Sequence, residues 1–233
     1  MGMADVILKL VGDKSKFIEY KPDIINTGFP EKAREIVKVA SQVDSRCRIF
    51  GAETHKYKFN PVASMEKVID FEKKYNIKLP EAYVSFLTQV GNGGAAPEYG
   101  LYSLEHIEQY ESEYLLQDDS DEVFIDKNLT PEKWSQTVRK LNETDDDEAY
   151  ILLMIKIMKG AVVIGSQGCT FDNLLMCSGS QAGKIVYWDW NMIEDYPPIF
   201  SDKTFEEWYL EYFHKIIVDD THKITSKIKG VNK

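Results

Sequence analysis

Histidine and cysteine most often carry metal-binding or nucleophilic chemistry, and this chain has four histidines and three cysteines. They are His55, His106, His214, His222, Cys47, Cys169 and Cys177. No two histidines stand four residues apart, and no two cysteines form a Cys-x-x-Cys pair. Zinc-binding helices and zinc ribbons depend on these spacings. We therefore expect neither a metal site nor a cofactor.

Two further patterns could indicate catalysis. A Cys169 nucleophile paired with a distant histidine is one alternative, but we interpret Cys169 as a buried structural cysteine and His55 as a structural histidine. The segment 179–185 reads G-S-Q-A-G-K-I. It is one residue shorter than a phosphate-binding loop and lacks the hydroxyl residue that holds magnesium. We therefore expect a protein that is not an enzyme.

Acidic residues dominate one part of the chain. The net charge is −10, and the stretch 105–148 holds fifteen Asp and Glu against four Lys and Arg. Its two dense clusters supply our candidate partner-binding residues, which are Asp118, Asp119, Asp121, Glu122, Asp145, Asp146 and Asp147. Neither cluster fits an EF-hand calcium loop. The clusters indicate either a solvated face that keeps the protein soluble or a docking surface for a basic partner. A chain this acidic is a poor candidate for binding nucleic acid directly.

Helical periodicity predicts most of the elements that position these residues. Apolar residues recur at helical spacing over 31–43, over 64–76 and over 80–90. Ser64 is a predicted N-cap, and Gly91 stands where a helix favours a left-handed residue after its last turn. The stretch 204–207 reads T-F-E-E, a capping box that starts a final helix.

Short apolar runs separated by glycine-containing turns predict strands after the acidic stretch. The runs are 151–157, 161–164, 174–177 and 185–190. Helices followed by strands and a last helix predict an α+β fold with a mainly antiparallel sheet flanked by helices. We expect a partly helical N-terminal extension over 1–49, a single domain over 50–218 with an acidic insert at 111–148, and a flexible tail over 219–233.

The sequence also bears on the compartment in which the protein acts. No apolar run approaches the roughly 20 residues that a membrane helix needs, and the N-terminus does not read as a signal peptide. An odd number of cysteines without short spacing argues for a reducing compartment. We therefore expect a cytoplasmic protein without a membrane partner.

A longer pattern resembles a known family. It begins with Leu79 and Pro80 before a helix and ends in a glycine-rich turn and strand region. Its members are Leu79, Pro80, Tyr83, Phe86, Leu87, Gly91, Asn92, Gly93, Gly94, Gly100, Gly168 and Cys169. Over residues 50–215 the chain resembles the SUKH superfamily, which includes bacterial toxin-immunity proteins and fungal regulators of cell-wall assembly. We interpret these motif residues as determinants of the fold.

The resemblance implies a binding protein, since the family has no shared catalytic set. The first hypothesis is an immunity protein that binds and neutralises a cognate toxin domain, such as a nuclease, whose basic surface an acidic protein would complement. The alternative is a regulatory or scaffold protein in cell-wall or envelope signalling. Should the acidic region not be the interface, the next candidates are the turn at 92–102 and the surroundings of Trp188 and Trp190.

Overall fold

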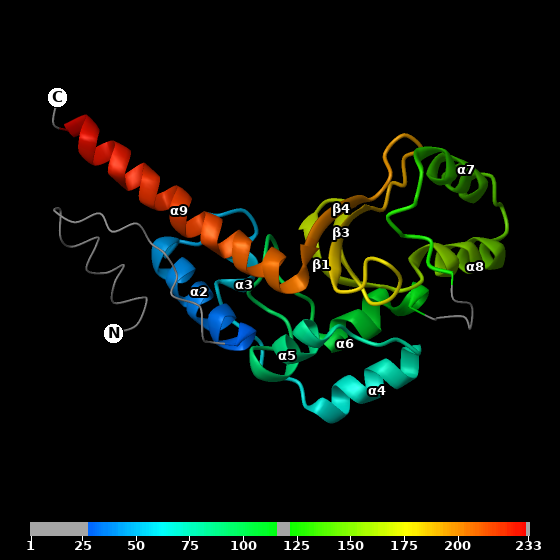
Figure 1. Ribbon diagram of the computed structural model, residues 1–233, viewed down its shortest axis with the longest axis horizontal. Coiled ribbons are helices and arrows are strands. Elements are labelled where there is room, and N and C mark those ends of the chain that lie inside the picture. The colour runs from blue at the N-terminus through cyan, green and yellow to red at the C-terminus, as the bar shows by residue number, and fades with distance from the viewer. Residues whose placement is uncertain (1–27, 116–121, 232–233) are drawn as a thin grey trace.

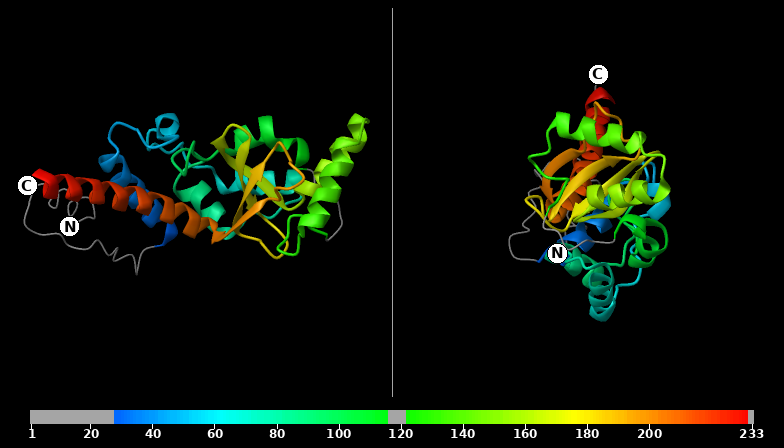
Figure 2. Two further views of the ribbon diagram at one scale, coloured as in Figure 1. Left: turned by 90° about the horizontal axis from the view of Figure 1, so that it is seen from above. Right: turned by 90° about the vertical axis from the view of Figure 1, so that its right-hand side faces the viewer.

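The computed structural model describes residues 28–115 and 122–231, with side chains up to Val218. Within these ranges, four strands form one antiparallel sheet in sequence order. The strands are β1 (Ala161–Gly168), β2 (Phe171–Met176), β3 (Lys184–Asp189) and β4 (Ile199–Thr204). Figures 1 and 2 show helices on both sides of this sheet. The predicted α+β class is confirmed.

Among the described residues, helices precede and follow the strands. Those before the sheet are α2 (Phe29–Val43), α3 (Ala52–His55), α4 (Met65–Tyr75), α5 (Glu81–Gln89), α6 (Leu104–His106), the π-helix η1 (Ile107–Glu111) and the 3₁₀-helix η2 (Ser112–Tyr114). Two more, α7 (Pro131–Asn142) and α8 (Asp147–Met158), lead into β1, and α9 (Phe205–Val231) ends the chain. None of these described helices combines the length and the apolarity that crossing a bilayer requires.

The first core lies between the sheet and the helices α2, α5 and α9. Phe86 of α5 is fully buried there, and its ring centroid lies 5.2 Å from that of Tyr209 on α9. Phe29 of α2 approaches Phe205 at 5.8 Å in an edge-to-face contact, a favoured geometry for aromatic pairs. The sequence left open whether the N-terminal segment docks on the domain. From Phe29 onward it does, because α2 shares this core.

Most predicted helix boundaries are confirmed by their caps. The Ser64 hydroxyl accepts a hydrogen bond from the Lys67 N–H at 3.2 Å, and Thr204 and Glu207 form the reciprocal bonds of a capping box. The prediction for Gly91 is wrong, because its φ is not left-handed. Glycine is needed there for space, since a Cβ would lie 2.8 Å from the Cβ of Phe59.

The second core covers the opposite face of the sheet. The strand predicted over 151–157 is wrong, because these residues belong to α8. Met154, Ile157 and Met158 recur at helical spacing and are buried. They join the buried side chains of α7 against Leu174 and Trp188 of the sheet. A short apolar run does not distinguish a buried strand from a buried helix. Part of the acidic insert, namely α7, therefore forms a helical layer on the sheet.

Replacing Phe86 with Ala should lower the free energy of unfolding by about 3–5 kcal/mol, because it opens a cavity in the first core. Urea denaturation measures this loss. The matched control is Phe50→Ala, since the Phe50 side chain is 61% exposed; it should cost about 1 kcal/mol or less. Equal losses in the two variants would contradict the assignment of Phe86 to the core.

Candidate functional site

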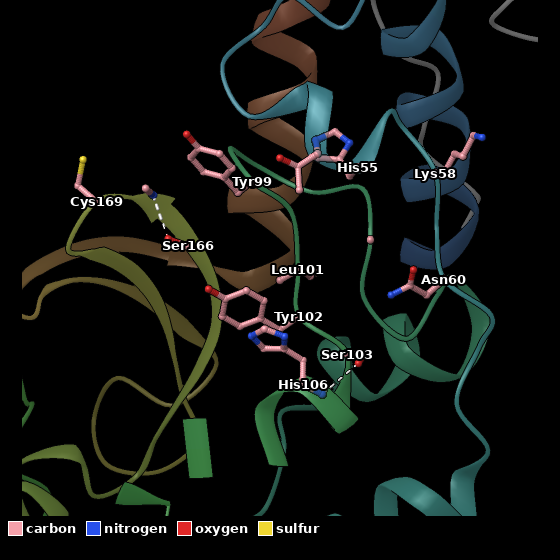
Figure 3. Close-up of a pocket in the computed structure, with 13 residues that line it drawn as sticks. His55, Lys58, Asn60, Tyr99, Leu101, Tyr102, Ser103, His106, Ser166 and Cys169 are labelled. Carbon is pink, nitrogen blue, oxygen red and sulfur yellow. Dashed lines mark hydrogen bonds between the residues drawn. The ribbon is translucent and has the colours of Figure 1, made fainter. Parts of the chain in front are cut away.

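An open groove of about 650 Å³ lies where the loop before α6 meets β1 (Figure 3). Its walls come from α3 and the loop after it, the segment 94–103, the end of α6, and the end of β1 with the β1–β2 turn. The lining residues are Thr54, His55, Lys58, Asn60, Gly94, Tyr99, Leu101, Tyr102, Ser103, His106, Ser166, Gly168 and Cys169. The groove coincides with the turn at 92–102, one of the alternative interfaces that the sequence suggested.

A ladder of single backbone bridges forms the floor beside this groove. Phe59 pairs with Gly94, Gly94 with Leu101, and Leu101 with Gly165 of β1. Gly94 and Leu101 exchange two N–H to C=O hydrogen bonds of 2.9 Å each. We call these four residues the glycine ladder. It continues the sheet past β1, so the loop that carries Tyr99 and Tyr102 is held to the strand by backbone contacts.

Close backbone approach explains the glycines around this ladder. A Cβ on Gly94 would lie 2.5 Å from the carbonyl oxygen of Lys58, and one on Gly165 would lie 2.4 Å from that of Gly100. Real Cβ atoms essentially never come this close to another heavy atom, and a backbone oxygen inside a hydrogen-bonded ladder has little room to move. The motif glycines Gly94 and Gly100 therefore act through packing as well as through the turn that the sequence predicted.

The motif asparagine fixes the end of the loop. Asn92 is 6% exposed, its Oδ1 accepts a hydrogen bond from the Leu104 N–H at 2.9 Å, and its Nδ2 donates to Glu105 at 2.7 Å. The amide thus satisfies one of the otherwise unpaired N–H groups at the start of α6. This contact places His106, which lies at the end of that helix.

His55 is held by hydrogen bonds within the fold. Its Nδ1 accepts from the Tyr57 N–H at 3.0 Å, and the ring also bonds the backbone of Glu98. Burial lowers the pKa of His55, so the ring is neutral at pH 7 and Nε2 carries its proton. This geometry is what a structural histidine requires. Tyr57, whose ring packs edge-on against His55 at 5.3 Å, donates its hydroxyl hydrogen to Asp44.

The expectation of a buried Cys169 is wrong, because the residue is exposed. It has φ 53° at the tight β1–β2 turn. Figure 3 shows the sulfur pointing away from His55 and His106. Among the described residues, no three His, Cys, Asp or Glu side chains are grouped so as to hold a metal ion.

Two carboxylates lie beside the Tyr102 and His106 wall of the groove. Asp172 of β2 is 8% exposed and accepts a 2.6 Å hydrogen bond from the Trp190 indole N–H. Burial, and then the charge of Asp172, raise the pKa of Glu111 at the end of η1. The same causes raise the pKa of Tyr102 to about 12. We call Asp172 and Glu111 the carboxylate pair; no local sequence pattern indicated it.

His106 connects the carboxylate pair to the groove. Its ring stacks on Tyr102 with centroids 4.1 Å apart, and its Nε2 lies 3.8 Å from Glu111 Oε1. Burial lowers the pKa of His106, so the ring is largely neutral at pH 7. The contact with Glu111 is therefore not an ion pair at that pH.

The predicted acidic residues fall into two groups. Asp118, Asp119 and Asp121 lie outside the described residues, while Glu122 is exposed 3.6 Å from Lys133. The other group is on the surface between α7 and α8 and forms no Lys or Arg ion pair within the described ranges. Its exposed members, here called the acidic edge, are Glu143, Asp145, Asp146, Asp147 and Glu148. Asp146 also caps α8 by accepting the Ala149 N–H at 2.8 Å.

Replacing Gly165 with Ala should destabilise the protein by about 3 kcal/mol, the upper end of the usual cost of overpacking, because the new methyl group would meet a backbone oxygen. The control is Gly28→Ala, whose Cβ would lie 3.1 Å from the flexible end of Glu31 and at an ordinary contact distance of 3.7 Å from Pro30. That change should cost about 1 kcal/mol or less. A loss below 1 kcal/mol for Gly165→Ala in urea denaturation would contradict the packing role of the ladder.

Comparison with known proteins agrees with this architecture. The family model described as SMI1 / KNR4 (SUKH-1) matches residues 63–211. The match includes α4, α5, Gly94, Gly100, the whole sheet and the start of α9. A search of curated proteins gave no match. Because the family model matches well over half of the 233 residues, the chain belongs to the SMI1 / KNR4 family (SUKH-1).

Proposed function

We propose that this protein is a cytoplasmic immunity protein that binds a cognate bacterial toxin domain and neutralises it without catalysis. Membership of the SUKH-1 family is consistent with an immunity or a regulatory role. The observation that favours binding a basic partner is the acidic edge. Its carboxylates are exposed and lie at the junction of two helices that pack on the sheet. Their charge is therefore held in a fixed position.

Charge complementarity supports a nuclease as the toxin. An enzyme that grips a phosphate backbone presents Lys and Arg around its active site. An acidic protein attracts such a surface at long range and can then cover it. The net charge of −10 and the concentration of acid between residues 105 and 148 meet this requirement.

The groove offers a surface that the toxin can bind once charge attraction has brought the two proteins together. Its wall carries the side chains of Tyr99 and Tyr102 on a loop that the glycine ladder holds in place, together with that of His106 on α6. Tyrosine is enriched at the energetic centres of interfaces, because it contributes a large contact area and loses little conformational entropy. We propose that the toxin seats a loop in this groove while the acidic edge steers its approach.

Inhibition should be stoichiometric. When the purified protein is titrated into the toxin domain encoded beside its gene, toxin activity should fall linearly and vanish near one equivalent. Co-expression should restore growth of cells that produce the toxin domain. Complete inhibition by a small fraction of one equivalent would contradict the non-enzymatic mechanism. No inhibition, together with capture of a kinase or wall synthase, would contradict the immunity function and favour the scaffold alternative.

Neutralising Asp145, Asp146 and Asp147 to Asn should slow association with the toxin about tenfold at low salt, because electrostatic steering is lost. Raising the salt concentration should reduce the difference between the variant and the wild type. Stability should change little, since these carboxylates are exposed and Asn caps a helix about as well as Asp. Stopped-flow or surface-binding kinetics at two salt concentrations measure the effect.

The control removes the same charge from another part of the surface. Glu66 and Asp70 of α4 and Glu81 of α5 are exposed, and α4 lies away from α7 and α8 in Figure 1. The triple change Glu66→Gln, Asp70→Asn and Glu81→Gln should slow association much less. Equal rates for both triple variants would show that net charge acts without a preferred surface, and would contradict the steering role of the acidic edge.

A further inference from the structure

Helix α8 is apolar over more of its circumference than the sheet covers. Residues 149–155 read A-Y-I-L-L-M-I, a run of consecutive apolar residues that extends over almost two helical turns. Met154, Ile157 and Met158 are buried in the second core, whereas the rest of the run cannot face the sheet at the same time. A helix that is apolar on all sides is normally buried on all sides. The outer side of α8 therefore lacks the cover that its composition predicts.

Leu152 lies at the centre of this outer side. It is 53% exposed, and Ile155, almost one turn further along the same face, is partly exposed. Figure 1 shows α7 and α8 at the end of the molecule opposite the C-terminus. Removing exposed apolar surface from water is favourable, so this face is suited to contact with another molecule.

Two opposite charges lie on either side of Leu152. Glu148 stands four residues before it and Lys156 four residues after it, so all three share one face of the helix. Glu148 and Lys156 are exposed, and within the described ranges neither forms an ion pair. They are about 12 Å apart along the helix axis, which is too far for them to pair with each other.

We propose that the outer face of α8 binds the same face of a second copy of this chain, with the two helices antiparallel. A two-fold axis at Leu152 places this side chain against its equivalent in the second copy. The same axis places Glu148 opposite Lys156 of the second copy, and Lys156 opposite Glu148. The face is therefore complementary to itself in shape of contact and in charge, as a two-fold interface requires.

Charge distinguishes this occupant from the alternatives. In a parallel pair, Glu148 and Lys156 would each lie beside their own equivalents, and like charges at an interface are unfavourable. A basic partner such as the proposed toxin would meet Lys156 with like charge. The antiparallel pair avoids both conflicts and keeps the two acidic edges at opposite ends of the contact. The dimer is a property of this chain and does not depend on the proposed function.

Sedimentation equilibrium of the purified protein over a range of concentrations tests the proposal. One helix packed on its copy is a small interface, so the dimer should dissociate on dilution. Leu152→Glu brings two carboxylates together on the two-fold axis and should leave a monomer at every concentration. The matched control is Met65→Glu on α4, because Met65 is 51% exposed and also lies on a helix. This control should dimerise as the wild type does.

Charge reversal tests the antiparallel arrangement. Glu148→Lys alone and Lys156→Glu alone should each raise the dissociation constant about tenfold, because like charges then meet twice in one dimer. The double variant restores both pairs with their signs exchanged, so it should recover the wild-type dissociation constant. Such recovery cannot arise within one molecule, since the two residues are too far apart to pair.

Several results would overturn the dimer. A wild-type protein that stays monomeric at millimolar concentration would do so, as would undiminished association of Leu152→Glu or no recovery in the double variant. If Leu152→Glu lost its helical circular dichroism, the charge-reversal variants, which keep Leu152, would decide alone. A monomeric wild type whose Leu152→Glu variant binds the toxin domain less tightly would assign this face to the toxin instead.

Discussion

Backbone crowding at the glycine ladder is the constraint on which the functional surface depends. The loop at 94–102 lies so close to β1 that a single methyl group on Gly165 would meet the carbonyl oxygen of Gly100 at 2.4 Å. This contact fixes the loop, and the loop fixes Tyr99 and Tyr102 at the groove. Asn92 then sets the start of α6, and η1 follows directly, so Glu111 is positioned by the same chain of contacts.

The two faces of the sheet support two separate cores, which have different roles. Alternate residues of a strand face opposite sides, so Leu175 belongs to the first core and Leu174 to the second. The first core, built on α2, α5 and α9, is the more aromatic and stabilises the domain. The second holds α7 and α8 against the sheet and so places the acidic edge. Asp172 of the same strand, β2, lies at the rim of the second core and accepts a hydrogen bond from the Trp190 indole N–H.

Sequence reasoning was most successful where a signal was local. The helix that carries Tyr83, Phe86 and Leu87 follows from its 3.6-residue period, and Ser64 follows from capping. It failed where tertiary packing decided the outcome. The run 151–157 is helical because a facing sheet buries one side of it, and Gly91 is needed for space. The carboxylate pair joins residues from η1 and β2 that no local pattern relates.

The central claim is that the groove and the acidic edge together form the partner-binding surface. Hydrogen exchange of the protein with and without the cognate toxin domain tests it most directly. The account predicts new protection over residues 94–111 and around the α7–α8 junction, with α4 unchanged. Protection confined to α4, or to the exposed side of α9, would place the interface elsewhere and contradict the account.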